Sequence, residues 1–311
     1  MKFSVVVAPL ALLLNAVITS AQSTQAVRAV TFNIRYDAGS RESGEKPWWD
    51  AFCWASASRC RQPHVINQLS QIAAGAPSGA VTVIGLQEVL NNQLNDIKNG
   101  LGSGWSHIGV GRDDGRTNGE FSPILYQPAA LRVLFSETKW LSPTPNVVSF
   151  GWGAGSRRVV TLAVFESVTT GKRFIHANTH LDNVSSQARS EGVRVVLGRI
   201  QAAQLAWGPI GVSITGDFNS QPGGDAYQTL LNSGYAQDLY NLATPAQRIG
   251  PYGNTYTTFT AGAPTSRIDF IWLGPVADRR YSVQRYEILS NEASGMLFSD
   301  HRAVVGDVTL L

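Results

Sequence analysis

The organisation of this chain is clearest in one stretch, Ile210-Gly211-Val212-Ser213-Ile214-Thr215-Gly216-Asp217-Phe218-Asn219. Its first part, Ile210–Thr215, is a short run rich in β-branched residues, which predicts a buried β-strand. The run ends at an acidic and an amide side chain, Asp217 and Asn219. Reactive groups that follow a strand are held on loops by a rigid sheet, which is where α/β proteins place their functional sites.

The same pattern, a strand that ends in polar residues, returns at other places in the chain. The segments are Thr31-Phe32-Asn33 at the end of Val27–Asn33, Gln87-Glu88 after Ala80–Leu86, His180-Leu181-Asp182 after Arg173–Thr179, then Arg267-Ile268-Asp269 and Ser299-Asp300-His301. A lone Asp or Asn after a strand is usually a turn residue. A lone His, such as His176, is usually structural. The ordered set, and not any one member, therefore indicates a site.

Further strands and helices are predicted between these segments. Strands are expected at Ser122–Tyr126, Val159–Glu166, Ile268–Leu273 and Ala303–Leu310, and helices at His64–Ala74, Val184–Trp207 and Gly223–Asn232. Strands and helices that alternate without strict regularity predict packed α/β layers. No repeat or low-complexity linker divides the chain, so we expect one domain over residues 22–311.

The composition excludes several classes of protein. The 311 residues are 43% hydrophobic and only 15% charged, which rules out a disordered chain, a collagen-like chain and a coiled coil. Lys and Arg minus Asp and Glu is 25 − 22 = +3. This small excess argues against a nucleic-acid binder driven by electrostatics.

The N-terminus has the pattern of an export signal. Lys2 precedes the apolar run Phe3–Leu14, and Thr19-Ser20-Ala21 supplies small residues at a cleavage position. A membrane anchor is the alternative, but a span needs ~20 apolar residues, and Asn15 interrupts this run. We expect a signal peptide over residues 1–21, a secreted, extracellular protein with a mature charge of +2, and no membrane span.

Export also affects how the two cysteines, Cys53 and Cys60, are interpreted. An even pair this close in an oxidising compartment predicts a local disulfide. A zinc site would need more Cys or His residues at ligand spacing, and a catalytic thiol would leave the second cysteine unexplained. The only glycosylation sequon, Asn183-Val184-Ser185, follows Asp182, and we expect low occupancy there.

Taken in order, these motifs resemble the endonuclease/exonuclease/phosphatase superfamily, whose fold is DNase I-like. Secreted and bacterial members are more similar still, through three further segments. These are Gly111-Arg112-Asp113-Asp114-Gly115, Gly119-Glu120-Phe121-Ser122-Pro123 and Trp140-Leu141-Ser142. The resemblance spans about Val27 to the C-terminus. It implies a four-layer α/β sandwich, with two mixed β-sheets packed together and helices outside.

The resemblance also implies a metal site. It places the ion at Glu88, with Asn33 beside it and Asp300 as a contributor. A carboxylate is a hard oxygen ligand that suits Mg²⁺, which keeps several waters and uses few carboxylates. The expected cofactor is therefore Mg²⁺ or Mn²⁺.

The same resemblance assigns the catalytic groups. Asp217 orients and deprotonates the attacking water, Asn219 donates to the phosphate, and His180 and His301 face the phosphate. Asp269 pairs with His301, and by the same resemblance Glu120 pairs with His180. A carboxylate partner raises the pKa of a histidine and keeps it cationic against phosphate.

Arg158, or its neighbour Arg157, resembles the family arginine that contacts the scissile phosphate. For Glu120 and Arg158 a plain surface charge is the alternative.

The expected activity is Mg²⁺-dependent hydrolysis of phosphodiester bonds, as in a nuclease. We expect the protein to be a monomer. The alternative substrates are sugar phosphates or lipid head groups, and a non-catalytic binding protein is a third interpretation. For binding nucleic acid, the sequence offers a local basic patch at Arg112, Arg116, Arg157 and Arg158. Phe150-Gly151-Trp152-Gly153 and Trp48-Trp49 offer rings that either stack on a base or sugar or simply pack in loops.

Overall fold

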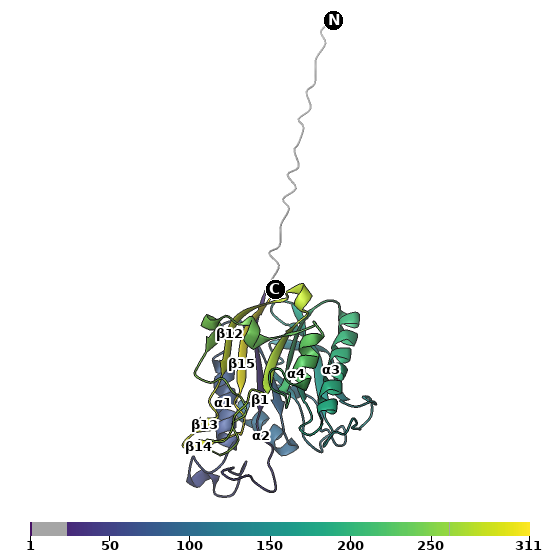
Figure 1. The fold of residues 1–311 in the computed structure, drawn as a ribbon. Helices are drawn as coiled ribbons and strands as arrows, with labels where there is room; N and C mark the ends of the chain where they lie inside the picture. Colours follow the sequence, from purple (N-terminus) through teal and green to yellow (C-terminus); the bar gives the residue numbers. More distant parts are fainter. Residues whose placement is uncertain (2–23, 261) are drawn as a thin grey trace.

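The computed structural model describes residues 1, 24–260 and 262–311. The expected signal peptide therefore lies outside the described residues, apart from Met1. Two mixed β-sheets make up the centre of the molecule (Figure 1). Among the described residues, no helix combines the length and the apolar character that crossing a bilayer requires.

The first sheet contains parallel and antiparallel neighbours. Its order is β10 (Arg248–Ile249), β12 (Tyr281–Ile288), β15 (Val304–Leu310), β1 (Gln25–Asn33), β2 (Val81–Gln87), β4 (Ile124–Tyr126) and β3 (Ser106–Ile108). The second sheet has the order β5 (Leu131–Trp140), β6 (Val159–Ser167), β7 (Arg173–His180), β8 (Gly211–Asp217), β11 (Asp269–Gly274) and β9 (Gln237–Asp238). A small hairpin pairs β13 (Glu292–Ala293) with β14 (Met296–Leu297).

Helices cover the outer face of each sheet (Figure 1). Apolar residues of α1 (Gln62–Ala74) and α2 (Asn91–Leu101) pack on the first sheet, and those of α3 (Ser186–Trp207) and α4 (Asp225–Asn232) pack on the second. A third apolar cluster fills the space between the sheets. The expected four-layer sandwich is therefore confirmed. The remaining helices are short: α5 (Leu239–Leu242), η1 (Cys53–Ala55), η2 (Pro245–Gln247) and η3 (Val276–Asp278).

Every strand and helix predicted from the sequence is present, with ends shifted by a few residues. Three longer elements were missed: β5, β12 and α2. Strand β5 lies at the edge of its sheet, carries a bulge between Val133 and Phe135, and is mostly half-buried, so it lacks an alternating apolar pattern. Helix α2 begins Asn91-Asn92 and contains Gly100, residues with weak helix propensity, and its burial of Leu94 and Ile97 stabilises it instead.

The two sheets approach very closely beneath the ends of β2 and β8. A Cβ atom on Gly85 would lie 2.3 Å from Thr215 Oγ1 and 2.4 Å from Asn178 Oδ1. Asn178 Oδ1 accepts hydrogen bonds from Gln87 Nε2 at 2.8 Å and from Thr215 Oγ1 at 3.0 Å. This buried network ties the sheets together where the polar strand ends begin.

The structure places His176 in the core, as expected for a structural histidine. Its Nδ1 lies 2.7 Å from Ser213 Oγ, and its Nε2 lies 3.2 Å from Thr215 Oγ1. Burial lowers the pKa of His176 to about 3. The histidine is therefore neutral in the folded protein and is not free to act as a catalytic acid.

His176 should make the fold sensitive to acid. Below the ordinary histidine pKa of ~6.5 the unfolded chain binds a proton that the folded chain does not, so stability is lost as the pH falls from about 6.5 toward 3. Between pH 7 and pH 5 this one group should cost about 2 kcal/mol. Denaturant unfolding measures the free energy of unfolding at both pH values. Between pH 7 and pH 5 this free energy should fall by about 2 kcal/mol less in His176→Gln than in the wild type. An equal loss in both proteins would contradict this prediction.

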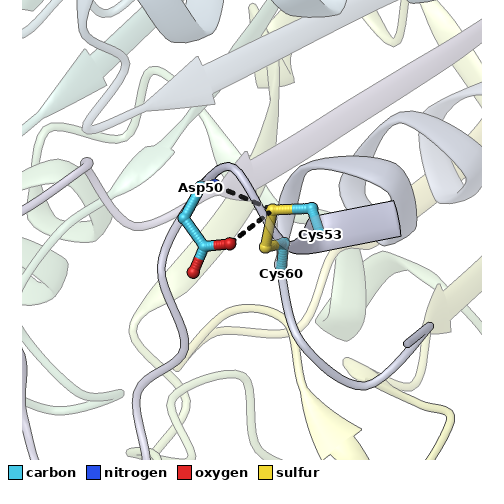
Figure 2. A group of neighbouring side chains, drawn as sticks. All are labelled: Asp50, Cys53 and Cys60. Atoms are coloured by element: carbon cyan, nitrogen blue, oxygen red, sulfur yellow. Dashed lines mark hydrogen bonds between the residues drawn. A yellow bond between two sulfur atoms is a disulfide. The ribbon is translucent and has the colours of Figure 1, made fainter. Parts of the chain in front are cut away.

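The expected disulfide between Cys53 and Cys60 is present, with the Cα atoms 5.5 Å apart (Figure 2). Asp50 lies against it and accepts a hydrogen bond from Arg59 Nε at 2.9 Å. Asp50, Cys53 and Cys60 are close enough together to suggest a metal site. Both sulfur atoms are bonded to each other, however, so neither is a thiolate ligand. The bond fixes an exposed loop between β1 and α1.

Candidate active site

The polar strand ends predicted from the sequence meet at one edge of the sandwich. Strands β1 and β2 are parallel with Asn33 opposite Gln87, and β7 and β8 are parallel with His180 opposite Asp217. Asp269 begins β11 directly opposite Asp217 in the antiparallel pair. Because β15 runs antiparallel to β1, the segment before it, which contains His301, reaches the same edge.

Asp217 lies at the centre of this cluster and is almost fully buried, with 1% of its surface exposed. Its Oδ2 accepts a hydrogen bond from Asn33 Nδ2 at 3.0 Å, and its Oδ1 accepts one from the Asn219 backbone N–H at 2.9 Å. The same Oδ2 lies 3.5 Å from His180 Nε2 and 3.7 Å from His301 Nε2. Burial, followed by the charge of Asp269, raises the pKa of Asp217 to about 7. A carboxylate tuned to this range accepts a proton well near neutral pH.

His301 and Asp269 form the pair that the resemblance implied. His301 Nδ1 lies 2.8 Å from Asp269 Oδ2, and both side chains are buried. Burial disfavours the charged imidazole, but Asp269 and Asp217 outweigh it and raise the pKa of His301 well above its ordinary value. His301 is thus cationic, with Nε2 left to face Asp217 and the open side of the site.

The structure corrects the expectation for His180. Glu120 binds Arg112 instead, through contacts of 2.8 and 2.9 Å, and its Oε2 is 3.8 Å from His180 Nδ1, too far for a hydrogen bond. Burial, followed by Arg158 and Arg112, lowers the pKa of His180 well below its ordinary value. His180 is therefore neutral here, because it is buried, two guanidinium groups lie near it, and its neighbour Glu120 is already paired with Arg112.

Asn219 links His180 to the cluster. Its side-chain Nδ2 lies 3.1 Å from His180 Nε2 and 3.0 Å from the Leu181 carbonyl oxygen. A hydrogen bond to a phosphate, which the resemblance implied for Asn219, requires this amide to release one of those partners.

Oxygen donors expected for a metal lie on the other side of Asp217. Glu88 Oε1 accepts a hydrogen bond from Asn33 Nδ2 at 3.0 Å, and Oε2 accepts one from the Tyr36 N–H at 3.2 Å. Burial opposes ionisation of Glu88, but Asn33 and the charge of His301 hold its pKa below the usual value. Burial, and then Glu88, raise the pKa of Asp300 to about 6.

This donor set fits a divalent cation. Glu88 and Asp300 are the hard oxygen ligands that Mg²⁺ prefers, whereas Asn33 turns its Nδ2 toward Glu88 and its Oδ1 accepts from the Arg35 N–H, so it would bind a cation through oxygen only after its amide turns over. Burial and the charge of Glu88 raise the pKa of Asp300 despite His301 and Arg35, so a further positive charge would be favourable there. Asp217, Asp269 and His301 also bring one ligand atom each within 4.8 Å of one another. His301 Nδ1 and Asp269 Oδ2 already bind each other, so Glu88 is the better-suited anchor.

Arg158 is not a surface charge, because it is only 7% exposed. Arg158 stands directly before β6. Its Nη2 donates to Asn183 Oδ1 at 3.0 Å, and its Nε lies 3.7 Å from Asp182 Oδ2. Arg157 is partly exposed and stacks over Phe150, with 5.5 Å between guanidinium and ring centre. The arginine deeper in the site is therefore Arg158.

Some residues of the site carried no usable signal in the sequence. Arg35 forms ion pairs with Glu45 and Glu42, both at 3.2 Å, and its charge acts on Glu88 and Asp300. The Tyr256 ring lies 5.0 Å from the His301 ring. Both stand in loops, where neither strand pattern nor motif singles them out.

Asp182, the last residue of a recognised motif, has an unexpected structural role. Its carboxylate accepts hydrogen bonds from the backbone N–H groups of Gly155, Ser156, Val184 and Ser185. It thereby ties the loop before Arg158 to the start of α3. These contacts hold Arg158 close to His180.

Backbone strain gathers at the same edge. Glu88, Asn219 and Arg35 have φ values of 59°, 46° and 57°, in the left-handed region that most side chains avoid. Non-glycine residues in this region cost about 1–3 kcal/mol each and are often found at functional sites. Here the strained positions place the Glu88 carboxylate against Asn33 and the Asn219 amide against His180.

Comparison with known proteins identifies the family. The family model described as "Endonuclease/Exonuclease/phosphatase family" matches residues 30–301. This chain belongs to that family. Among curated proteins no significant sequence match is found.

Solved structures agree with this membership. An endonuclease/exonuclease/phosphatase from Bacteroides vulgatus is 32% identical, with a TM-score of 0.75 over 92% of this chain and 100% of that one. A mannosyl-6-phosphatase from Bacteroides thetaiotaomicron is 26% identical, with a TM-score of 0.74 over 91% and 99%. The human nocturnin catalytic domain, 18% identical with a TM-score of 0.64 over 92% and 95%, is similar in fold.

The family makes this chain a phosphoric ester hydrolase, and its members generally use a divalent metal. The non-catalytic interpretation is therefore excluded. Every residue assigned from the resemblance lies at the edge described above, but the individual catalytic roles stay predictions.

Proposed function

We propose that this chain is an exported, Mg²⁺-dependent hydrolase of small phosphate esters, in which Asp217 activates the attacking water. The observation that carries the proposal is the position of Asp217. It is buried between two histidines, held by Asn33 and the Asn219 N–H, and close to a carboxylate set that suits a cation.

The proposed reaction follows from these contacts. Asp217 accepts a proton from water while the water oxygen bonds to phosphorus and the bond to the alcohol oxygen breaks. The departing alkoxide takes a proton from solvent and leaves as the alcohol, and Asp217 then releases its proton to solvent. His301, kept cationic by Asp269, donates from Nε2 to a phosphoryl oxygen. Glu88 and Asp300 would hold a divalent cation, which would supply charge stabilisation for the phosphoryl and leaving oxygens. Asn33 keeps Asp217 and Glu88 at fixed positions because its amide donates to both.

Two observations favour a small ester over long nucleic acid. Arg112 and Arg158, which the sequence placed in a basic patch, are largely buried and lie near carboxylates. A relative that is 26% identical is named a mannosyl-6-phosphatase. Nucleic acid remains the second candidate, supported by the exposed Phe150 beneath Arg157, which offers a ring for a base.

A substrate panel with Mg²⁺ tests the proposal. It should compare hexose phosphates, a bis-aryl phosphodiester, oligonucleotides and sphingomyelin. We expect the highest kcat/KM on a small soluble ester. Preference for oligonucleotides supports the second candidate, and no hydrolysis of any ester contradicts the proposal.

Metal removal should abolish activity. The three carboxylates of Glu88, Asp300 and Asp217 outnumber the cationic His301 and Arg35 that act on them, so we expect the loss to be complete in EDTA and reversed by Mg²⁺ or Mn²⁺. Glu88→Gln should raise the Mg²⁺ concentration needed for half-maximal activity. Full activity in chelator, or recovery with Zn²⁺ alone, would contradict the metal assignment.

Export and the monomeric state are also proposals. The signal-like residues 1–21 and the disulfide support export, since disulfides persist in oxidising compartments. N-terminal sequencing of protein from the culture medium should find a start near Gln22, and light scattering should give the mass of one chain. Retention of the full chain inside the cell would contradict the export proposal.

A further inference from the structure

A cavity of about 440 Å³ opens beside the catalytic edge. This volume is within the range of small-molecule sites, ~300–1,000 Å³. Two of its walls also belong to the active site: Asn219, which contacts His180, and Tyr256, whose ring packs on His301. Other residues that line the cavity are Ser220, Gln221, Asp225, Arg189 and Ser266.

The cavity holds a charged pair that is already neutralised. Arg189 Nε and Nη2 donate to the Asp225 carboxylate at 2.9 and 2.6 Å, and Nη1 donates to the Asp182 carbonyl oxygen at 3.1 Å. Asp225 Oδ1 also accepts from the Ala226 N–H at 2.6 Å. Because the guanidinium charge is balanced, this cavity is poorly suited to a second phosphate group.

What the cavity does offer is neutral hydrogen-bonding groups and a ring. Asn219, Gln221 and Ser266 line it, and Tyr256 adds an aromatic residue. The Nδ2 of Asn219 is already bound to His180 and Leu181, which leaves its Oδ1 as the acceptor. Amide and hydroxyl groups together with one ring suit a sugar, whose hydroxyls need hydrogen bonds while its C–H faces pack on aromatic rings. An aliphatic alcohol would leave these polar groups without partners.

The loop that forms the cavity is tightly folded. Asn219 has φ 46° and Gly223 has φ 87°, and a Cβ on Gly224 would lie 2.5 Å from Ser220 Oγ. The walls are therefore held in place by the backbone, which makes the cavity a feature of the fold.

We propose that this cavity binds the sugar of a sugar phosphate while the phosphate lies at Asp217. The inference rests on the proposed function and adds the chemical class of the alcohol. Gln221 and Ser266 are specificity residues in this assignment, because neither has a proposed catalytic role, and among the described residues Ser266 meets the active site only through backbone hydrogen bonds to Tyr256. Phosphate recognition stays with the residues around Asp217.

Two matched substrates test the assignment. A hexose 6-phosphate and ethyl phosphate share a primary alkyl ester, and only the first has a sugar to place in the cavity. The wild type should have a kcat/KM at least ~10-fold higher for the hexose phosphate. Ser266→Leu, which fills the cavity, should remove that advantage mainly through KM and leave ethyl phosphate hydrolysis within twofold.

Gln221→Ala is the second variant, since Gln221 is exposed and its loss leaves the fold intact. It should lower kcat/KM for the hexose phosphate about three- to tenfold, the scale of one hydrogen bond, with ethyl phosphate unchanged. If Ser266→Leu loses both activities through misfolding, Gln221→Ala decides the question. Equal kcat/KM for the two substrates in the wild type, a preference for a dinucleotide, or parallel losses in Gln221→Ala would overturn the assignment. A wild type inactive on every ester would instead overturn the proposed function.

Discussion

Replacing Asp217 by Asn should lower kcat by at least ~10²-fold, the usual scale for a positioned base. The amide cannot accept a proton from water. It also keeps only one of the two acceptor oxygens that now bind Asn33 and the Asn219 N–H. Initial rates at saturating substrate and Mg²⁺ measure the effect.

Stability should change little in this variant. Asp217 is a buried carboxyl whose pKa is already raised to about 7, so a neutral side chain removes an unfavourable buried charge as well as a hydrogen bond. Asp278→Asn is the matched control, because its carboxylate pairs with Arg280 at the surface. Near-normal turnover of Asp217→Asn, or an equal loss in Asp278→Asn, would show that the base is misassigned.

The second large effect concerns Asp269 and His301. His301→Ala and Asp269→Asn should each remove most activity, because Asp269 holds His301 cationic through a contact of 2.8 Å. The double variant should be little worse than His301→Ala alone, since residues that act as a unit are not additive. Rates of the four proteins in this cycle provide the measurement.

A structural role for Asp269 makes a different prediction. Asp269 is fully buried, and its Oδ1 has no hydrogen-bond partner among the described residues. If it served only the fold, Asp269→Asn would lower Tm, and the two rate losses would multiply. Histidine NMR gives a further readout, because Asp269→Asn should lower the pKa of His301 toward its ordinary value. An unchanged pKa together with multiplicative losses would rule out the pair.

The strands that carry the site could be predicted from the sequence because their chemistry is local. A buried strand such as β8 is a short run rich in β-branched residues, and the acidic residue that ends it is visible as a break in the pattern. The convergence of Asn33, Asp217 and His301 depends on pairing between distant strands. Only the resemblance to a family anticipated that convergence.

What the sequence missed depends on tertiary contacts. The neutral state of His180 follows from its burial and then from the charges of Arg158 and Arg112. Arg112 also takes the Glu120 carboxylate, and no spacing in the sequence reveals which partner a carboxylate prefers. The role of Asp182 is similar, since two of its N–H donors come from the loop between β5 and β6 and two from the segment between β7 and α3. Strand β5 was missed because an edge strand that is only half-buried does not require alternating apolar residues.

Hydrolysis in ¹⁸O-labelled water is the most direct test of the central claim, that water attacks phosphorus at this site. The purified mature protein would be incubated with Mg²⁺ and its preferred ester, and the products analysed by mass spectrometry. One ¹⁸O atom should enter the released phosphate and none the alcohol, and Asp217→Asn should form almost no labelled product. Label in the alcohol, or equal labelled product from the wild type and Asp217→Asn, would contradict the account.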